Sequence, residues 1–258
     1  MSTPQGAKKE YETASALYDL IPSVPAGVLE SQLIKHALGD ATGLTVLDLG
    51  GGSGLHAREA IDAGAKFVDI VDISPDMMQR ARNAEVALGR EAEHRVRFFE
   101  ADVSQPLDHI TLSEKQYDIV MANWVFDHAG SEDILEGMWR NIAAYLKPGG
   151  LFLGIRIAQL FAGAEHTEKY GVTLKDFREV PGGALLTVRI HGDNPFEFEA
   201  ASMEASYSGS TRMHEKYGLR NVQTVPYEVA AVLAEDREFW DMFLQKPFFA
   251  VTTGVKEE

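Results

Sequence analysis

One glycine-rich turn constrains the fold of this chain more than any other segment. Residues 44–49 (LTVLDL) form a short apolar run, the turn follows at 50–54 (GGGSG), and a helical pattern continues from there to about residue 64. A buried strand, a glycine turn and a helix in this order predict the first unit of a parallel sheet. Because ligands bind beyond the carboxyl ends of the strands in such sheets, the turn is a candidate binding site.

The alternation of strands and helices continues along the chain. Apolar runs predict strands at 66–73, 96–99, 117–122 and 151–157, and helical spacing predicts helices at 75–88 and 131–145. Ser74 and Ser131 stand where a side chain caps the first turn of each helix. Near-continuous apolar strands indicate burial on both faces of a sheet. We therefore expect an α/β fold with a Rossmann-like, mostly parallel seven-stranded sheet and helices on both faces.

We expect one domain over residues 1–258, with two segments added to this core, one before the first strand and one after the fifth. Two helices are predicted at 11–20 and 28–37, separated by Pro22 and Pro25, and would form an N-terminal helical lid over residues 1–40. An irregular insertion over residues 158–206 follows the fifth strand and contains two predicted antiparallel strands, 185–190 and 196–200. The α/β pattern then resumes with a helix at 210–217, a strand at 222–225, a helix at 236–243 and a strand at 248–253.

Composition excludes several classes of function. The chain has 24 Lys and Arg against 39 Asp and Glu, a net charge of −15, and such a field repels nucleic acids and anionic membranes. It has no cysteine, which excludes disulfides and thiolate metal sites, and its histidines lack metal-ligand spacing. The start of the chain lacks the apolar core of a signal peptide. We expect a cytoplasmic protein with no metal, no nucleic-acid partner and no membrane partner, whereas its oligomeric state is unknown.

The spacing of the glycines rules out two nucleotide-binding motifs. A dinucleotide motif needs glycines at the first, third and sixth positions, but the sixth position from Gly50 is Leu55 and the third from Gly51 is Ser53. A phosphate-binding loop needs a lysine after its last glycine, and Leu55 stands there instead. What remains is Asp-x-Gly-x-Gly-x-Gly, with Asp48 as the acid before the turn.

This pattern resembles the class I S-adenosylmethionine-dependent methyltransferases. Four later segments resemble the same family in the same order: 71–74 (VDIS), 100–103 (EADV), 123–128 (NWVFDH) and 146–150 (LKPGG). The resemblance implies that the glycine turn lies under the methionine part of the cofactor. It also implies that Asp72 binds both ribose hydroxyls, with Asp69 as the alternative, and that an acid in the segment 100–103 binds the adenine amine. The implied cofactor-binding residues are Tyr11, Tyr18, Asp48, Gly50, Gly52, Gly54, Asp72, Ile73, Met77, Asp102, Val103, Asn123 and Trp124.

Shorter segments resemble the small-molecule N-methyltransferases of the toxoflavin-pathway type. They are 18–22 (YDLIP), 169–171 (KYG) and 238–240 (EFW). By this resemblance the N-terminal helix closes over the cofactor, and Tyr11 and Tyr18 contact the methionine carboxylate. The alternative is that the two tyrosines, seven residues apart on one helical face, only pack.

Methyl transfer makes few demands on side chains, because the protein mainly holds the nucleophile near the methyl group and excludes water. An oxygen nucleophile needs a general base, whereas an amine needs only to be neutral. We expect His128 to be that base or a hydrogen-bond partner of the substrate, and packing is the alternative. The candidate substrate contacts are Phe126, Arg156, His166 and Tyr170.

The sequence therefore predicts an enzyme that transfers a methyl group from S-adenosylmethionine to a nitrogen or oxygen of a small metabolite by in-line displacement. The alternative is a non-methylating protein of the same fold, either an aminopropyl-type transferase or a catalytically silent cofactor-binding regulatory partner. A dehydrogenase is the most distant possibility.

Overall fold

A central sheet of seven strands organises the protein. The computed structural model describes residues 6, 8, 18, 20–160, 167–206 and 209–258. The strands of this sheet are β1 (Thr45–Leu49), β2 (Phe67–Asp72), β3 (Val96–Glu100), β4 (Tyr117–Asn123), β5 (Leu146–Ile157), β9 (Leu219–Thr224) and β10 (Phe249–Lys256). Their order is β3-β2-β1-β4-β5-β10-β9, with β1 to β5 parallel and β10 antiparallel to both of its neighbours. Across the sheet the strand numbers fall from β3 to β1 and then rise from β4, so the order in which the chain adds strands reverses between β1 and β4. The predicted fold class is confirmed.

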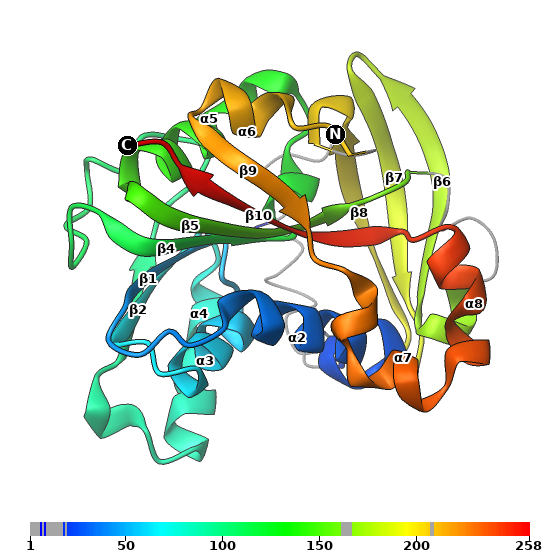
Figure 1. The fold of residues 1–258 in the computed structure, drawn as a ribbon, viewed down its shortest axis with the longest axis horizontal. Helices are drawn as coiled ribbons and strands as arrows, with labels where there is room; N and C mark the ends of the chain where they lie inside the picture. The colour runs from blue at the N-terminus through cyan, green and yellow to red at the C-terminus, as the bar shows by residue number, and fades with distance from the viewer. Residues whose placement is uncertain (1–5, 7, 9–17, 19, 161–166, 207–208) are drawn as a thin grey trace.

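Helices cover both faces of this sheet (Figure 1). On one face lie α2 (Pro25–Leu38), α3 (Leu55–Asp62) and α4 (Pro75–Ala87), and on the other lie α5 (Glu132–Tyr145) and α6 (Arg212–Lys216). The predicted caps are confirmed, since the Ser74 side chain accepts a hydrogen bond from the Met77 amide and Ser131 from the Ile134 amide. The two faces have separate hydrophobic clusters, with Leu33 buried in one and Trp139 in the other.

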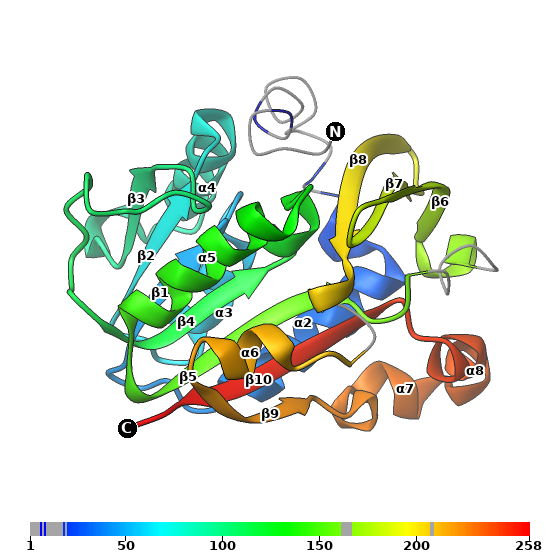
Figure 2. The same cartoon turned by 90° about the horizontal axis from the view of Figure 1, so that it is seen from above.

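A second sheet stands beside the end of the first (Figure 2). It contains β6 (Val172–Val180), β7 (Gly183–Ile190) and β8 (Phe196–Met203), all antiparallel. Only β7 and β8 were predicted. The sequence hides β6 because charged residues interrupt its alternation at 175–179. The described part of the insertion over residues 158–206 thus contains a three-stranded sheet.

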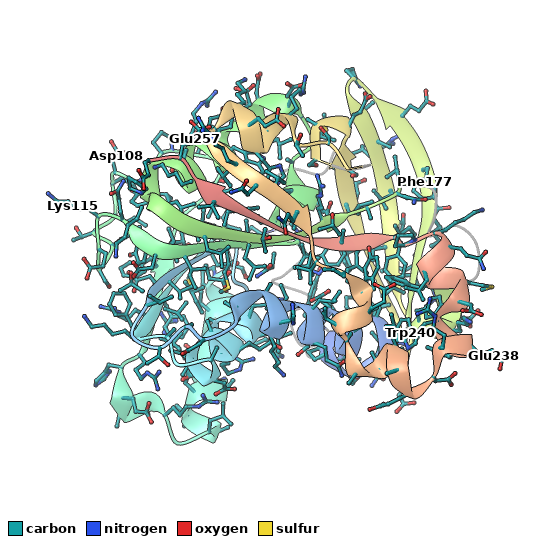
Figure 3. All side chains as sticks on the ribbon, viewed as in Figure 1. Asp108, Lys115, Phe177, Glu238, Trp240 and Glu257 are labelled. Atoms are coloured by element: carbon teal, nitrogen blue, oxygen red, sulfur yellow. The ribbon has the colours of Figure 1, made fainter. Side chains whose placement is uncertain are left out.

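The remaining elements are short. Helices α7 (Ala231–Glu235) and α8 (Arg237–Gln245) precede β10, and single 3-10 turns occur as η1 (Ile21–Ser23), η2 (Glu91–Glu93), η3 (Val125–His128), η5 (Thr167–Tyr170), η6 (Glu204–Ser206) and η7 (Tyr227–Val229). In α8, Trp240 points into the protein and is 3% exposed, whereas Glu238 points outward (Figure 3). None of the helices in the described ranges is long and apolar enough to cross a membrane.

Some predicted boundaries differ from those of the structure. The segment 146–150, which precedes the strand predicted at 151–157, is already part of β5, where a register shift lets the strand continue past Gly149. The strand expected at 222–225 is β9 and begins three residues earlier, at Leu219. The short helix α7 was not predicted. The helix predicted at 11–20 lies outside the described residues except for Tyr18 and Leu20.

Candidate functional site

Two cavities meet at the carboxyl ends of β1, β2 and β4, the edge where the sheet order reverses. The main cavity, of about 190 Å³, is lined by the glycine turn, by α2, by η3 and by the inner face of the second sheet. The small cavity, of about 80 Å³, lies beside the ends of β2 and β3. Both cavities are lined by Gly50, Asn123, Trp124 and His128. One elongated ligand could therefore occupy both.

The glycine turn brings the backbone close to both cavities. Gly50 has a φ of +72°, and a Cβ atom there would lie 2.6 Å from the Val125 side chain, so only glycine fits. Gly52 has a φ of +53° and lines the main cavity. Gly54, the N-cap of α3, has a φ of +76° but lines neither cavity. It lies close to Ala81 of α4. Two of the three predicted glycines thus lie at the cavities.

Asp72 ends β2 and lines the small cavity. Its Oδ2 atom accepts a hydrogen bond from the Gly52 amide at 2.9 Å, and its Oδ1 atom accepts one from the Ser74 amide at 2.8 Å. Burial raises the pKa of this carboxyl, and the bonds from these two amides and from Ile73 oppose that effect. A carboxylate has about four acceptor positions, so Asp72 retains capacity for a ligand.

Asp69, the alternative to Asp72, faces away from both cavities. It is fully buried and accepts hydrogen bonds from Ser113 and from the Tyr117 hydroxyl, and it forms an ion pair with Arg97 at 3.0 Å. These contacts hold the β3–β4 connection against β2. Of the two acids, the structure brings only Asp72 to the small cavity.

The floor of the main cavity holds polar groups that the described residues leave unpaired. Asp48 is 1% exposed, and neither of its carboxyl oxygens has a hydrogen-bond partner among the described residues. Burial raises its pKa to about 7, although the charge of His56 opposes the shift. The amide nitrogen and oxygen of Asn123 likewise have no partner in the described part of the chain. Buried polar atoms without partners are costly, so these groups indicate a polar ligand.

The far end of the small cavity is formed by Ile73, Asp102, Val103 and Met138. Asp102 is oriented by the backbone amide and hydroxyl of Ser104, which donate to its Oδ1 atom at 2.9 and 2.7 Å. Met138 comes from α5 and was not predicted, because its helical spacing marks it only as a core residue. Ile73, Asp102 and Val103 were all predicted.

A buried ionic network supports the wall shared by the two cavities. The Trp124 indole donates to Glu30 Oε2 at 2.7 Å, and His56 pairs with Glu30 at 3.2 Å and with Glu59 at 2.8 Å. Burial alone would lower the pKa of His56, but its two carboxylate partners outweigh it and raise the pKa to about 10. Trp124 has a φ of +59°, an uncommon conformation for this residue. Glu30 and His56 also line the main cavity, and sequence reasoning missed both.

His128 ends η3, lines both cavities and is half-buried. Burial lowers its pKa to about 4, so its ring is neutral at pH 7. Two further predicted residues, Tyr18 and Met77, line the main cavity. Tyr18 is half-buried there and packs against Phe196 and Phe198 of β8, with ring centroids 5.2 and 5.4 Å apart.

Three predicted substrate contacts lie elsewhere. Phe126 is in the hydrophobic core, stacked on Trp139 with ring centroids 5.0 Å apart. Arg156 donates to the backbone oxygens of Ser206 and Ser210, and Tyr170 packs among the aromatic side chains of α8. None of the three lines either cavity, so we correct this part of the prediction. The predicted residues Tyr11 and His166 lie outside the described residues.

The second sheet supplies the apolar wall that those residues were expected to form. Alternate residues of all three of its strands face the main cavity: Val172, Leu174, Val188, Ile190, Phe198 and Ala200. Their period of two along each strand is a signal that could have identified them. No group of three or more metal-ligating side chains occurs in the described part of the chain.

Comparison with known proteins agrees with this fold. Residues 47–152 match a family model described as a methyltransferase domain. The CcbJ methyltransferase from Streptomyces caelestis has a similar structure, with a TM-score of 0.60, 19% identity and 100% of each chain covered. So has the 1,6-didemethyltoxoflavin-N1-methyltransferase from Burkholderia thailandensis, with a TM-score of 0.56, 16% identity, and 98% of this chain and 88% of that chain covered.

A third similar structure is that of the cyclase SpnF, with a TM-score of 0.61, 15% identity, and 99% of this chain and 96% of that chain covered. No curated protein matches the sequence. At these identities the solved structures establish the fold alone. Residues 47–152 thus resemble a methyltransferase domain, and the whole chain has the Rossmann-like fold of the S-adenosylmethionine-dependent methyltransferases.

Proposed function

We propose that this protein transfers the methyl group of S-adenosylmethionine to a small molecule bound in the main cavity. The observation that carries this proposal is the meeting of the two cavities at Gly50, Asn123, Trp124 and His128. The small cavity has acids suited to a nucleoside, and the main cavity offers an apolar space for an acceptor. A methyl group at the junction would face both.

The residues at the two cavities fit the cofactor. Asp72 would accept from the ribose hydroxyls, and Asp102 would accept from the adenine amine beside Val103. Asp48 and Asn123, whose polar atoms lack partners among the described residues, would bind polar groups of the methionine part above Gly50. Bound S-adenosylmethionine supplies a methyl group activated by a positively charged sulfur.

The chain's own residues then have to position the acceptor and exclude water. The apolar face of the second sheet and the Trp124 indole would bind the body of the acceptor, and α2 and Tyr18 would close the cavity from the other side. This assigns a lid role to residues 1–40 and an acceptor-binding role to residues 158–206. A cytoplasmic location, a metal-free reaction and the lack of a nucleic-acid partner stay predictions from the sequence.

The proposal is tested by incubating the full chain with methyl-labelled S-adenosylmethionine and a panel of apolar amines, phenols and alcohols. We expect formation of S-adenosylhomocysteine together with a labelled product that has gained one methyl group. A product without label, or an isomerised compound of unchanged mass, would favour a non-methylating reaction on this fold, such as the cyclase SpnF illustrates.

Replacing His128 by alanine is expected to lower kcat by roughly 10- to 100-fold, because a neutral imidazole at the junction can accept a proton or a hydrogen bond from the nucleophile. The same variant should bind S-adenosylhomocysteine within about threefold of the wild-type affinity, since the nucleoside contacts assigned above do not involve this ring. His36→Ala is the matched control, because His36 is exposed on α2. Equal kcat values for wild type and His128→Ala would contradict a role of His128 in the reaction and would indicate that it only packs.

A further inference from the structure

Asp127 is a buried acid that lines the main cavity. It has no part in the cofactor contacts proposed above, and the proposed role of His128 as a proton acceptor does not involve it. It lies in η3, its backbone amide donates to the Trp124 carbonyl at 3.3 Å, and its side chain lines the main cavity but not the small one. The residue is 6% exposed, and its Oδ2 atom has no hydrogen-bond partner among the described residues. The turn therefore holds a carboxyl at the cavity wall without pairing it.

The other charged groups at this cavity do not neutralise Asp127. Glu30 uses one carboxyl oxygen for His56 and the other for Trp124, and His56 is shared with Glu59. Asp48 adds another acid under the glycine turn, and His128 is neutral at pH 7. No lysine or arginine is among the described residues that line the cavity. Burial alone accounts for the raised pKa of Asp127, which agrees with the lack of a cationic neighbour.

The surroundings of Asp127 are otherwise apolar. The second sheet faces it across the cavity with Val172, Leu174, Val188, Ile190 and Phe198, and Phe249 adds an aromatic ring. An unpaired carboxyl in such a cavity is costly, and a ligand that brings an N–H cation would remove most of that cost. An alcohol would supply a hydrogen bond without charge, and a carboxylate ligand would be repelled.

We propose that the acceptor is an apolar molecule carrying a basic amine and that Asp127 binds the N–H group of this amine. This inference rests on the proposed function and narrows its acceptor to nitrogen. The amine enters as an ammonium ion paired with the Asp127 carboxylate. Its proton passes to Asp127 Oδ2, which leaves a neutral amine whose lone pair is available for attack.

The transfer then balances with no further reactant. The nitrogen lone pair forms the new N–C bond, the electrons of the broken S–C bond stay on the sulfur, and the N-methylated ammonium carries the positive charge. The proton held by Asp127 goes to solvent when the product leaves. His128, the next residue, would accept a hydrogen bond from a second N–H of the same nitrogen.

The test uses three ligands of one shape: 1-naphthylmethylamine, 1-naphthylmethanol and 1-naphthoate. Each is titrated calorimetrically into the full chain, both free and loaded with S-adenosylhomocysteine. We expect the amine to bind wild type at least ~10-fold more tightly than the alcohol, and naphthoate to bind most weakly. Asp127→Asn should lower amine affinity by ~10-fold or more while changing alcohol affinity by less than about threefold. Asp127→Glu should restore part of the preference.

Asp193→Asn is the matched control for the loss of one negative charge, because Asp193 is exposed between β7 and β8. Equal binding of amine and alcohol to wild type, or no binding of either, would overturn the inference. So would an unchanged preference in Asp127→Asn. A loss of S-adenosylhomocysteine binding in that variant would assign Asp127 to the cofactor instead. Failure of wild type to bind S-adenosylhomocysteine would count against the proposed function, while the titrations of the free protein would still decide the role of Asp127.

Discussion

Replacing Asp72 by alanine is expected to lower the affinity for S-adenosylhomocysteine by roughly 10- to 100-fold. The carboxylate ends β2 at the small cavity, already oriented by the amides of Gly52 and Ser74. The ribose hydroxyls would donate to the acceptor capacity that these amides leave free, and a hydrogen bond to a charged acceptor contributes about 1.5–3 kcal/mol. Calorimetric titration of wild type and variant measures the difference directly.

Two companion variants separate the loss of ribose contacts from damage to the turn. Asp72→Asn retains one acceptor oxygen, so we expect an affinity between those of wild type and Asp72→Ala. Asp76→Ala removes an exposed acid four residues away on α4 and should bind like wild type. Thermal unfolding shows whether each variant is folded. A folded Asp72→Ala protein with wild-type affinity would refute the ribose assignment.

The parts of the site that could be predicted from sequence are those set by local pattern. A glycine turn after an apolar strand brings the backbone to the carboxyl edge of the sheet. Because the next strand is parallel, the acid at its end lies at the same edge. Asp48, Gly50 and Asp72 were found for this reason. The strand β6 was missed because charged residues at 175–179 interrupt the alternation that begins with the buried Val172 and Leu174.

The wrong substrate contacts have a physical explanation in strand geometry. Successive side chains of a strand point to opposite faces of the sheet. In β5, Ile157 lines the main cavity, so Arg156 must point to the opposite face, where it meets the backbone of residues 206 and 210. The polarity of Arg156 suggested a ligand contact, but the period of two in this strand already excluded one.

The ionic network could not be predicted because its members are far apart in sequence and have no shared pattern. Glu30 comes from α2, His56 from α3 and Trp124 from the end of β4. Only the packing of α2 and α3 on the same face of the sheet brings them together. This network also connects α2 to Trp124 in the cavity wall.

Replacing His56 by glutamine is expected to lower the free energy of unfolding at pH 7 by about 3–5 kcal/mol, because it leaves the buried carboxylate of Glu30 without its cation and leaves Glu59 with only the exposed Lys35, at 3.7 Å. The difference from wild type should shrink as the pH rises. In the folded protein the pKa of His56 is raised from 6.5 to about 10 by Glu30 and Glu59. The folded state therefore holds a proton that the unfolded state loses above pH 6.5, and this stabilisation is complete below pH 6.5 and is lost as the pH passes through about 10.

Urea unfolding of both proteins between pH 6 and pH 10.5 measures this effect. Wild type should lose up to ~1.4 kcal/mol per pH unit from His56 within that window, and His56→Gln should lack this contribution. Other groups that titrate there, such as lysines, are common to both proteins and cancel in the difference. His36→Gln, at an exposed position on α2, should follow wild type. Parallel curves for wild type and His56→Gln would mean that His56 is uncharged in the folded protein. In that case Glu30 would hold Trp124 at the cavity wall without the charge of His56.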